Sequence, residues 1–293
     1  MYYFVAKATR GCPVKSRPPA VAGSFYPAAP RALTRTVDQQ LAQARVQLAA
    51  RSAATELQSP ATRTIAPPKA LISPHAGYVY SGSTAALGFA TLNPQTHPIG
   101  RVVIAGPTHR VAVRAVAIPA VEAFRTPLGE VPLDTETLET LTEFAQVVVR
   151  DDVHADEHAL EVQLPFLQRV LGEFSVLPLA VGDLPPDQVA EVLDAVWGGP
   201  ETLIVISTDL SHYESYDRAR ELDADTIERI LAVEASVGDR RACGVRPLNG
   251  FLTLAATRRL KPTLLGMCNS GDTAGDKRRV VGYVSVAWHQ EQP

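Results

Sequence analysis

The chain has 293 residues, 46% of them hydrophobic and 20% charged, a balance that allows a sizeable core and excludes disorder of the whole chain. A formal net charge of -3 offers no basic field for a nucleic acid backbone, so nucleic acids are not expected among its partners. Three scattered cysteines are too few for a disulfide framework and predict a cytoplasmic protein. No apolar run is typical of a secretory signal or long enough to span a membrane.

The N-terminal part of the chain predicts a tail, a helix and a loop. Residues 1–16 have mixed charge and precede two prolines, so we expect a flexible tail before a single domain over residues 17–293. Apolar residues spaced along one face predict a helix over residues 30–48. The Ala-, Ser/Thr- and Pro-rich residues 49–68 predict a loop.

From residue 70 onward, short apolar runs alternate with amphipathic segments. The apolar runs predict strands over residues 70–72, 101–105, 147–149, 174–181, 202–207, 263–267 and 280–288, with a β excursion within 111–121. The amphipathic segments predict helices over 83–92, 157–170, 187–197, 216–235 and 248–260, and one capped by Asp134. Continuously apolar strands are typical of a sheet buried on both faces. The sequence therefore predicts an α/β fold, with a mostly parallel or mixed central sheet flanked by helices.

Ionisable side chains follow three of these predicted strands where each strand ends. His75 follows the first strand and His109 the second, and Asp209 and His212 follow the strand over 202–207. In open α/β sheets, the loops at the carboxyl ends of parallel strands converge on one crevice. We therefore expect three imidazoles and one carboxylate around one volume. The alternative for each residue taken alone is a turn residue bonded to the backbone.

A second cluster, His154-Ala155-Asp156-Glu157-His158, matches the H-x-x-E-H spacing of inverted zinc peptidases. That motif requires a helix through both histidines. Asp156 is instead predicted to be the N-cap of the following helix, which makes His154 a solvated loop residue and places Glu157 in a first helical turn. A zinc hydrolase is therefore only the third functional hypothesis. The sequence contains no G-x-S-x-G elbow, P-loop lysine motif or strand-linked G-x-G-x-x-G.

Several sequence blocks, in order along the chain, carry a resemblance to a known family. They are Pro19–Pro27, Pro74–Tyr78 with Tyr80–Gly82, Gly106–His109, Asp156–Glu161 with Gln163–Phe166, Ser207–Tyr213, Ala242–Gly244 and Val281–Tyr283. From Arg17 to about Trp288, the chain resembles the Memo family, called AmmeMemoRadiSam system protein B in many prokaryotes. One departure is Ala159, where the family usually carries serine.

The resemblance implies a fold similar to that of class III extradiol dioxygenases, which are non-haem iron enzymes. It implies metal ligands at His75, His109 and Cys243. It also places His212 at the position of the dioxygenases' catalytic acid/base, with Asp209 beside it to fix the tautomer of a ligand or of His212. Without the resemblance, Cys243 would be interpreted as a small buried hydrophobe.

The donor set suggests the cofactor and the reaction type. Two imidazoles and a carboxylate are the usual ligands of oxygen-activating iron(II). A softer thiolate in place of the carboxylate favours iron of altered potential, or copper. We therefore expect an oxygenase-like redox metalloprotein with iron(II), or alternatively copper, acting on an unidentified small molecule or peptide.

The second hypothesis is a metal-stabilised module that binds a peptide or partner protein without turnover. Animal members of the family are associated with signalling, which is why this hypothesis stands beside the enzyme. In prokaryotes the family's genes accompany those of a radical-SAM protein and an AMMECR-type protein, which implies a shared pathway.

Overall fold

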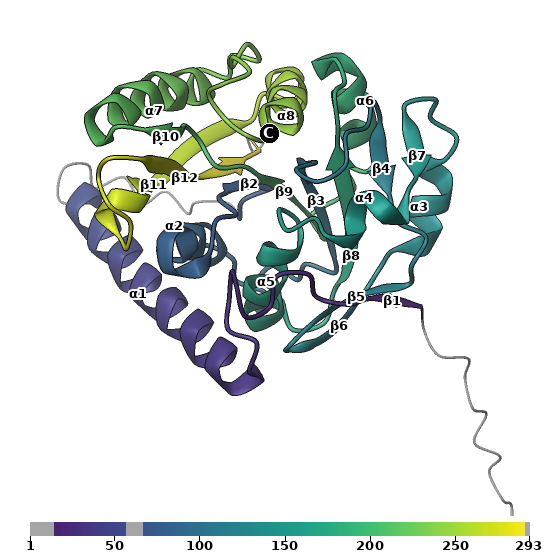
Figure 1. The fold of residues 1–293 in the computed structure, drawn as a ribbon, viewed down its shortest axis with the longest axis horizontal. Helices are drawn as coiled ribbons and strands as arrows, with labels where there is room; N and C mark the ends of the chain where they lie inside the picture. The colour runs from purple at the N-terminus through teal and green to yellow at the C-terminus, as the bar shows by residue number, and fades with distance from the viewer. Residues whose placement is uncertain (1–14, 57–66, 291–293) are drawn as a thin grey trace, which may run out of the picture.

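The computed structural model describes residues 15–56 and 67–290 (Figure 1). In that part of the chain, nine strands form one sheet with the order β10–β12–β2–β9–β3–β8–β4–β7, and β11 pairs with β12. The strands are β10 (His212–Glu214), β12 (Val280–His289), β2 (Ala70–Ser73), β9 (Thr202–Ser207), β3 (Arg101–Pro107), β8 (Ser175–Val181), β4 (Val116–Ile118), β7 (Val147–Val149) and β11 (Lys261–Asn269). Parallel neighbours in this order are far apart in sequence, so the chain crosses over the sheet between them.

The central strands β2, β9, β3 and β8 run parallel, whereas β12 and β4 are antiparallel to β2 and β8. Every residue of β9 is buried, as expected for an apolar strand that is covered on both faces. The predicted α/β fold is therefore confirmed with a mixed sheet. Each predicted strand is present, while β10, a short strand of polar residues, was not predicted because it lacks an apolar pattern.

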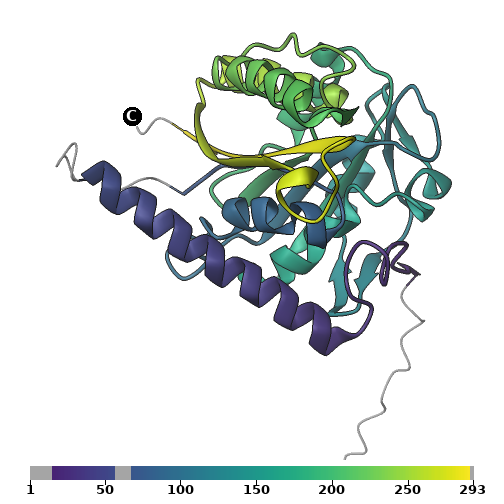
Figure 2. The same ribbon diagram turned by 60° about the vertical axis from the view of Figure 1, so that its left-hand side comes forward.

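Helices cover both faces of the sheet. They are α1 (Pro30–Glu56), α2 (Tyr78–Phe89), α3 (Thr135–Leu141), α4 (Asp151–Ala155), α5 (Leu164–Leu171), α6 (Pro186–Ala195), α7 (Tyr216–Leu231) and α8 (Val245–Thr257). Figure 2 shows the strands β11 and β12, in yellow, between the green helices on one face and the purple helix α1 and blue helix α2 on the other. In agreement, α2 contacts α1 and α5, and α8 contacts α6.

The N-terminal part of the chain differs from its prediction. The tail predicted over residues 1–16 lies outside the described residues except for Lys15 and Ser16. The loop predicted over 49–68 is wrong in its first part, because α1 continues to Glu56. Alanine favours helix, so the Ala-rich sequence after residue 48 extends α1. Residues 57–66 lie outside the described part of the chain.

The helix predicted over residues 157–170 is interrupted. The chain forms α4, then a turn, then the 3-10 helix η1 (Glu161–Gln163), and then α5. Asp156, predicted as an N-cap, is instead the C-cap of α4. Pro165 lies in the first turn of α5, where a missing N–H costs nothing, and it could not continue an earlier helix without loss of a hydrogen bond.

A small second sheet lies beside the main one. It consists of β1 (Ser16–Arg17), β5 (Ala123–Thr126) and β6 (Gly129–Pro132), with β1 parallel and β6 antiparallel to β5. One hydrophobic core joins these elements to the central sheet. In the described parts of the chain, no helix combines the length and the apolar character that crossing a bilayer requires. A 3-10 helix, η2 (Ser270–Asp272), links β11 to the loop before β12.

Candidate metal centre

Three parallel neighbours, β2, β9 and β3, end at the same edge of the sheet. His75 follows β2, Asp209 follows β9, and His109 follows β3. The carboxylate of Asp209 accepts a hydrogen bond of 2.7 Å from the backbone N–H of His75, so the first two loops are joined directly. The sheet therefore brings these strand-end residues together, as the sequence predicted.

His75, His109 and Cys243 each offer one ligand atom, and these atoms lie within 4.8 Å of one another. The Sγ atom of Cys243 is 3.1 Å from Nε2 of His75. Cys243 reaches the site from the loop before α8, and its neighbour Gly244 allows that approach. A Cβ atom at Gly244 would lie 2.8 Å from the carbonyl oxygen of Ser207, which is too close.

The tautomer of His75 follows from its hydrogen bonds. Ser207 Oγ donates to the carbonyl of Ala159 at 2.6 Å and accepts from Nε2 of Gln163 at 2.8 Å. The serine has one proton, so Nδ1 of His75, 2.9 Å away, must be the donor to Oγ. Nε2 of His75 is then unprotonated and faces Cys243, which is the state that a metal ligand requires.

Glu157 fixes the tautomer of His109. Its carboxylate accepts from Nδ1 of His109 at 2.9 Å, from the backbone N–H of His109 at 2.5 Å and from that of Ala159 at 2.8 Å. Burial opposes ionisation of Glu157, but the hydrogen bonds and charge of His109 outweigh it and lower the pKa of Glu157 to about 2. In the neutral ring of His109, the bond from Nδ1 to Glu157 leaves Nε2 free. The sequence predicts that Asp209 fixes the tautomer of a ligand or of His212; the carboxylate that bonds the ring of His109 is that of Glu157.

Asp209 and His212 lie beside the candidate ligands. Burial raises the pKa of Asp209 to about 6, although hydrogen bonds from the backbone and the charge of His212 oppose the shift. Nδ1 of His212 donates to the carbonyl of Leu210 at 2.8 Å, which leaves Nε2 free in a partly exposed ring. Burial lowers the pKa of His75, and the charges of His109 and His212 act in the same direction. Burial and the charge of Asp209 raise the pKa of the Cys243 thiol to about 12.

His158 belongs to the site, although the sequence predicts no role for it. Its ring stacks on His109 with centroids 4.6 Å apart, meets His75 edge-on at 5.4 Å and contacts Phe25 at 4.6 Å. With His109 and Glu157 it forms a second group of potential metal ligands. Burial lowers the pKa of His158 to about 3, with the charge of His75 acting in the same direction. The sequence signal for His158 was its place in a block shared with the Memo family.

His154 does not join the site. It is buried in α4 rather than solvated, and Nε2 hydrogen-bonds the carbonyl of Ala117 at 2.9 Å. The interrupted helix separates it from Glu157 and His158, and within the described residues neither group of potential metal ligands includes it. The solvated position predicted for His154, and the helical first turn predicted for Glu157, are therefore wrong.

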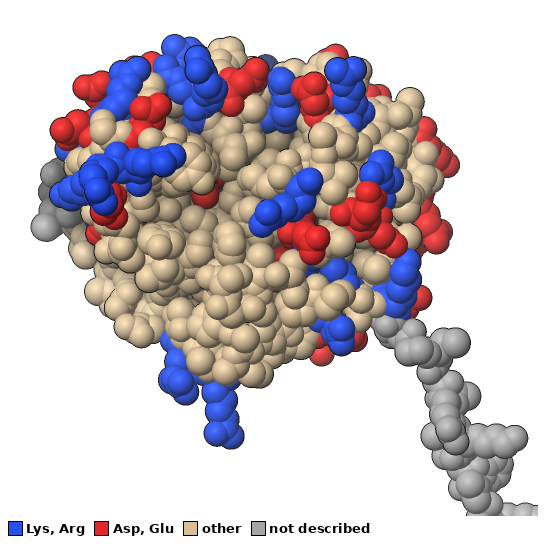
Figure 3. All heavy atoms as spheres, viewed as in Figure 1, with Lys and Arg blue, Asp and Glu red and all other residues tan. Residues whose placement is uncertain are grey.

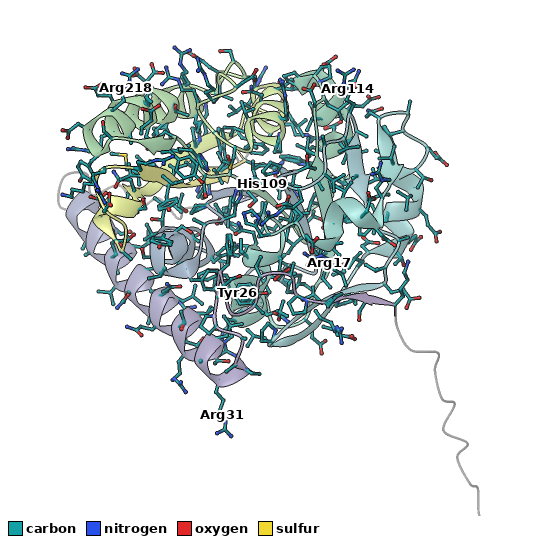
Figure 4. The ribbon with its side chains drawn as sticks, viewed as in Figure 1. Arg17, Tyr26, Arg31, His109, Arg114 and Arg218 are labelled. Atoms are coloured by element: carbon teal, nitrogen blue, oxygen red, sulfur yellow. The ribbon has the colours of Figure 1, made fainter. Side chains whose placement is uncertain are left out.

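The site opens onto one face of the molecule. Figure 4 labels His109 near the centre of this face, and Figure 3 shows a hollow beside that position. Uncharged residues border most of the hollow, while Lys and Arg side chains lie on both sides of it (Figure 3). A small molecule that enters the hollow would therefore meet His109 early, since its side chain is 27% exposed.

Comparison with known proteins places the chain in a family. The family model described as Memo-like protein matches residues 17–287. This chain belongs to the Memo family. A MEMO1 family protein from Sulfolobus acidocaldarius is 34% identical over 285 residues, which cover 92% of this chain and 98% of the relative. A Memo relative from Methanopyrus kandleri, also a MEMO1 family protein, is 35% identical over 289 residues, covering 94% and 99% of the two chains.

Among solved structures, an uncharacterized protein, JW3007, from Escherichia coli K12 is similar to this Memo chain. The TM-score is 0.47 and the sequence identity 15%, and the similarity covers 74% of this chain and 98% of the other.

Proposed function

We propose that this Memo-family chain is a redox metalloprotein related to oxygenases, which binds iron(II), or alternatively copper, through His75, His109 and Cys243. The convergence of three ligand atoms within 4.8 Å carries this proposal. It is supported by the partners of both histidines, since Ser207 and Glu157 leave each Nε2 free. Preset tautomers of this kind are typical of metal-binding histidines.

The donor chemistry fits such a metal. Two neutral imidazoles and a thiolate suit iron or copper better than a hard cation such as magnesium. Burial and the Asp209 charge keep the Cys243 thiol protonated when no cation is beside it. A bound cation would stabilise the thiolate, so binding and deprotonation of Cys243 are coupled.

When bound, iron or copper supplies open coordination positions and one-electron chemistry. The protein's own residues would then orient the substrate and move protons. His212 presents an unbonded Nε2 from a partly exposed ring, which suits a proton carrier at the mouth of the site. Asp209 anchors the His75 backbone and holds a carboxyl group with a pKa near 6 beside His212.

Metal content after anaerobic purification tests the proposal. We expect the wild-type chain to hold near-stoichiometric iron or copper and Cys243→Ala to lose it. Cys268→Ala is the matched control, because Cys268 is also a free cysteine but its Sγ contacts Thr84 Oγ1 instead of a histidine. Equal metal in wild type and Cys243→Ala would exclude the proposed ligand set.

The second candidate is a metal-stabilised module that binds a peptide or partner protein without turnover. The replacement of a carboxylate ligand by Cys243 favours it, since the thiolate changes the metal's reactivity. Oxygen consumption by the iron-loaded protein, with candidate substrates present, separates the two: turnover supports the enzyme. We further propose that the protein works in the reducing cytoplasm, in a pathway with radical-SAM and AMMECR-type proteins.

A further inference from the structure

Exposed apolar side chains gather next to the candidate metal centre. Val79 and Tyr80 lie in the first turn of α2, just after the loop that carries His75, and are 65% and 38% exposed. Tyr213 directly follows His212 and is 65% exposed. Large exposed apolar groups beside a hollow are typical of a binding surface. Tyr213, whose ring centroid is 5.8 Å from that of His212, would contact the apolar body of a ligand that enters the hollow.

Tyr213 is held in a backbone conformation that side chains other than glycine rarely adopt. Its φ is 60°, and β10 and β12 lose their regular register between His212 and Glu214. Two other such residues, Val233 and Arg259, lie just beyond the ends of α7 and α8, where this conformation is common. Tyr213 has no helix end to explain it. A β-bulge changes the direction in which a side chain points. Strained backbone conformations such as that of Tyr213 are common at functional sites.

Arg279 lies over the exposed ring of Tyr213. Its guanidinium carbon is 5.0 Å from the ring centroid. Within the described residues, Arg279 forms no ion pair, whereas its neighbour Arg278 pairs with Asp276. An arginine that stacks on an aromatic ring keeps its N–H groups free at the edge of the guanidinium plane. Those N–H groups can bind the oxygens of an anion in pairs.

Arg110 gives a second unpaired cation at the same site. It follows His109 in the chain, is exposed, and forms no ion pair with any described residue. It is the chain neighbour of His109, whose ring stacks on that of His158 with centroids 4.6 Å apart. Figure 3 shows Lys and Arg on both sides of the hollow, with Asp and Glu side chains beside them.

We propose that the mouth of the metal centre binds a small organic oxyanion, a carboxylate or a phosphate ester, through Arg279. The apolar or aromatic body of the ligand rests on Tyr213, and Arg110, which follows His109, adds long-range attraction. This proposal names the substrate class of the proposed metalloprotein. Binding of the anion does not depend on the proposed function, but its reaction as a substrate does. The anion contacts come from residues outside the ligand set.

Binding of benzoate, phenyl phosphate and neutral phenol to the full chain tests this proposal, by calorimetry at one fixed low ionic strength. We expect both anions, or one of them, to bind more tightly than phenol. Arg279→Gln should weaken binding of that anion by about tenfold or more and leave phenol unchanged, because only the charge-assisted hydrogen bonds are lost. The relative strength of the two anions then identifies carboxylate or phosphate.

Two further variants keep the test specific. Tyr213→Gly removes the ring and relieves the backbone strain, so the melting temperature should stay or rise while all three probes bind more weakly. Arg218→Gln is the control, because Arg218 lies on α7, pairs with Glu221 and is labelled well away from His109 in Figure 4. Its affinities should match wild type. Phenol binding as tightly as both anions, or anion binding unchanged in Arg279→Gln, would overturn the proposal.

The outcome is separable from that of the metal proposal. Metal content is measured on the same samples, and Arg279→Gln should retain it. Cys243→Ala, if it loses metal, should still bind the anion, and adding Arg279→Gln to this variant should weaken that binding. If the anion binds only to metal-loaded protein and Arg279→Gln binds it equally well, then the anion is a metal ligand and Arg279 is not its anchor.

Discussion

At the scale of single residues, the candidate centre depends on groups that do not touch the metal position. Ser207 and Glu157 each hold Nδ1 of one histidine, and each is itself bonded to the backbone near Ala159. A buried, fully bonded partner restricts the ring orientation as well as the tautomer. The hydrogen-bond partners Ser207 and Glu157 therefore determine whether Nε2 of each histidine is free to bind a metal.

The first prediction concerns Glu157→Gln. The amide removes the negative charge and turns an N–H group toward donors that the carboxylate accepts from, namely His109 and Ala159. We expect anaerobic titration with iron(II) to give about 10–100-fold weaker binding. The exposed Glu173→Gln serves as control. Equal iron affinity in Glu157→Gln would mean that His109 needs no carboxylate support.

The second prediction concerns His154 and acid. Burial lowers the pKa of His154 from 6.5 to about 4, so the folded protein keeps the ring neutral while the unfolded chain takes up a proton. Stability is therefore lost as pH falls from about 6.5 toward 4, at about 1.4 kcal/mol per pH unit for this one group. His154→Gln can keep a hydrogen bond to Ala117 without titrating.

Urea unfolding at pH 7 and pH 5 checks this expectation. His154→Gln should lose less stability than wild type between the two values, although other buried histidines still contribute. Its metal content should equal that of wild type, because His154 lies in neither group of potential ligands. Loss of metal in this variant would restore the zinc hydrolase hypothesis.

At the scale of elements, the loop after β9 is held by β12 and α7. Gly282 accepts from the backbone of Leu210 at 2.8 Å and donates to that of Ser211 at 2.9 Å, and Asp223 on α7 accepts from Ser211 at 3.0 Å. Nδ1 of His212 bonds the carbonyl of Leu210. The direction of the His212 ring is thus fixed by two elements that come later in the chain.

Gly282→Ala gives the third prediction. A Cβ atom at this position would overlap the buried carboxylate of Asp223, which cannot move without losing Ser211. We expect a loss of about 1–3 kcal/mol in the free energy of unfolding, measured in urea. Gly100→Ala, where a Cβ atom meets nothing within 4 Å, should change it by less than about 0.5 kcal/mol. Equal effects of the two substitutions would contradict the proposed packing.

The interruption between α4 and α5 shows that helical spacing in the sequence does not by itself predict a continuous helix. The spacing of Leu160, Leu164 and Leu167 fits one helix, and all three are buried. Glu157 and Glu161 are buried too, because they bind His109 and the N-terminal segment. Those two carboxylates decide the local backbone, and their partners lie far away in sequence.

At the scale of the whole molecule, hydrogen bonds to Glu161 hold the N-terminal segment, residues 17–26, next to the site. Its buried carboxylate accepts from Arg17 at 2.7 Å, from the backbone of Ala20 and Val21 at 2.7 and 3.1 Å, and from the hydroxyl of Tyr26. Figure 4 labels Arg17 and Tyr26 on the same side of His109. The segment thereby places the Phe25 ring 4.6 Å from that of His158.

Arg17→Met gives the fourth prediction. The Arg17 and Glu161 side chains are only 5% and 0% exposed, so the variant leaves a buried carboxylate without its cation. We expect a loss of about 3–5 kcal/mol in the free energy of unfolding. Arg169→Met, which breaks a half-exposed pair with Asp38, should cost about 0–1 kcal/mol. A similar loss in both variants would show that the buried Arg17–Glu161 pair contributes no more to the free energy of unfolding than an exposed pair.

The sequence by itself determined the α/β architecture and the edge of the sheet where the candidate site lies. Apolar runs and helical spacing are local signals, and parallel strands bring their carboxyl ends together whatever the loops contain. His75, His109 and Asp209 could be selected for that reason. Cys243 depended on family resemblance, because nothing near it in the sequence indicates a ligand.

The tertiary structure alone decided how the site is completed. The supports at Ser207 and Glu157, the stacking of His158 and the contact between Tyr213 and Arg279 all join residues that are distant in the chain. Such contacts depend on loop paths and on the burial of polar groups, and each polar group takes the partner that compensates its loss of water. No periodicity in the sequence records that choice.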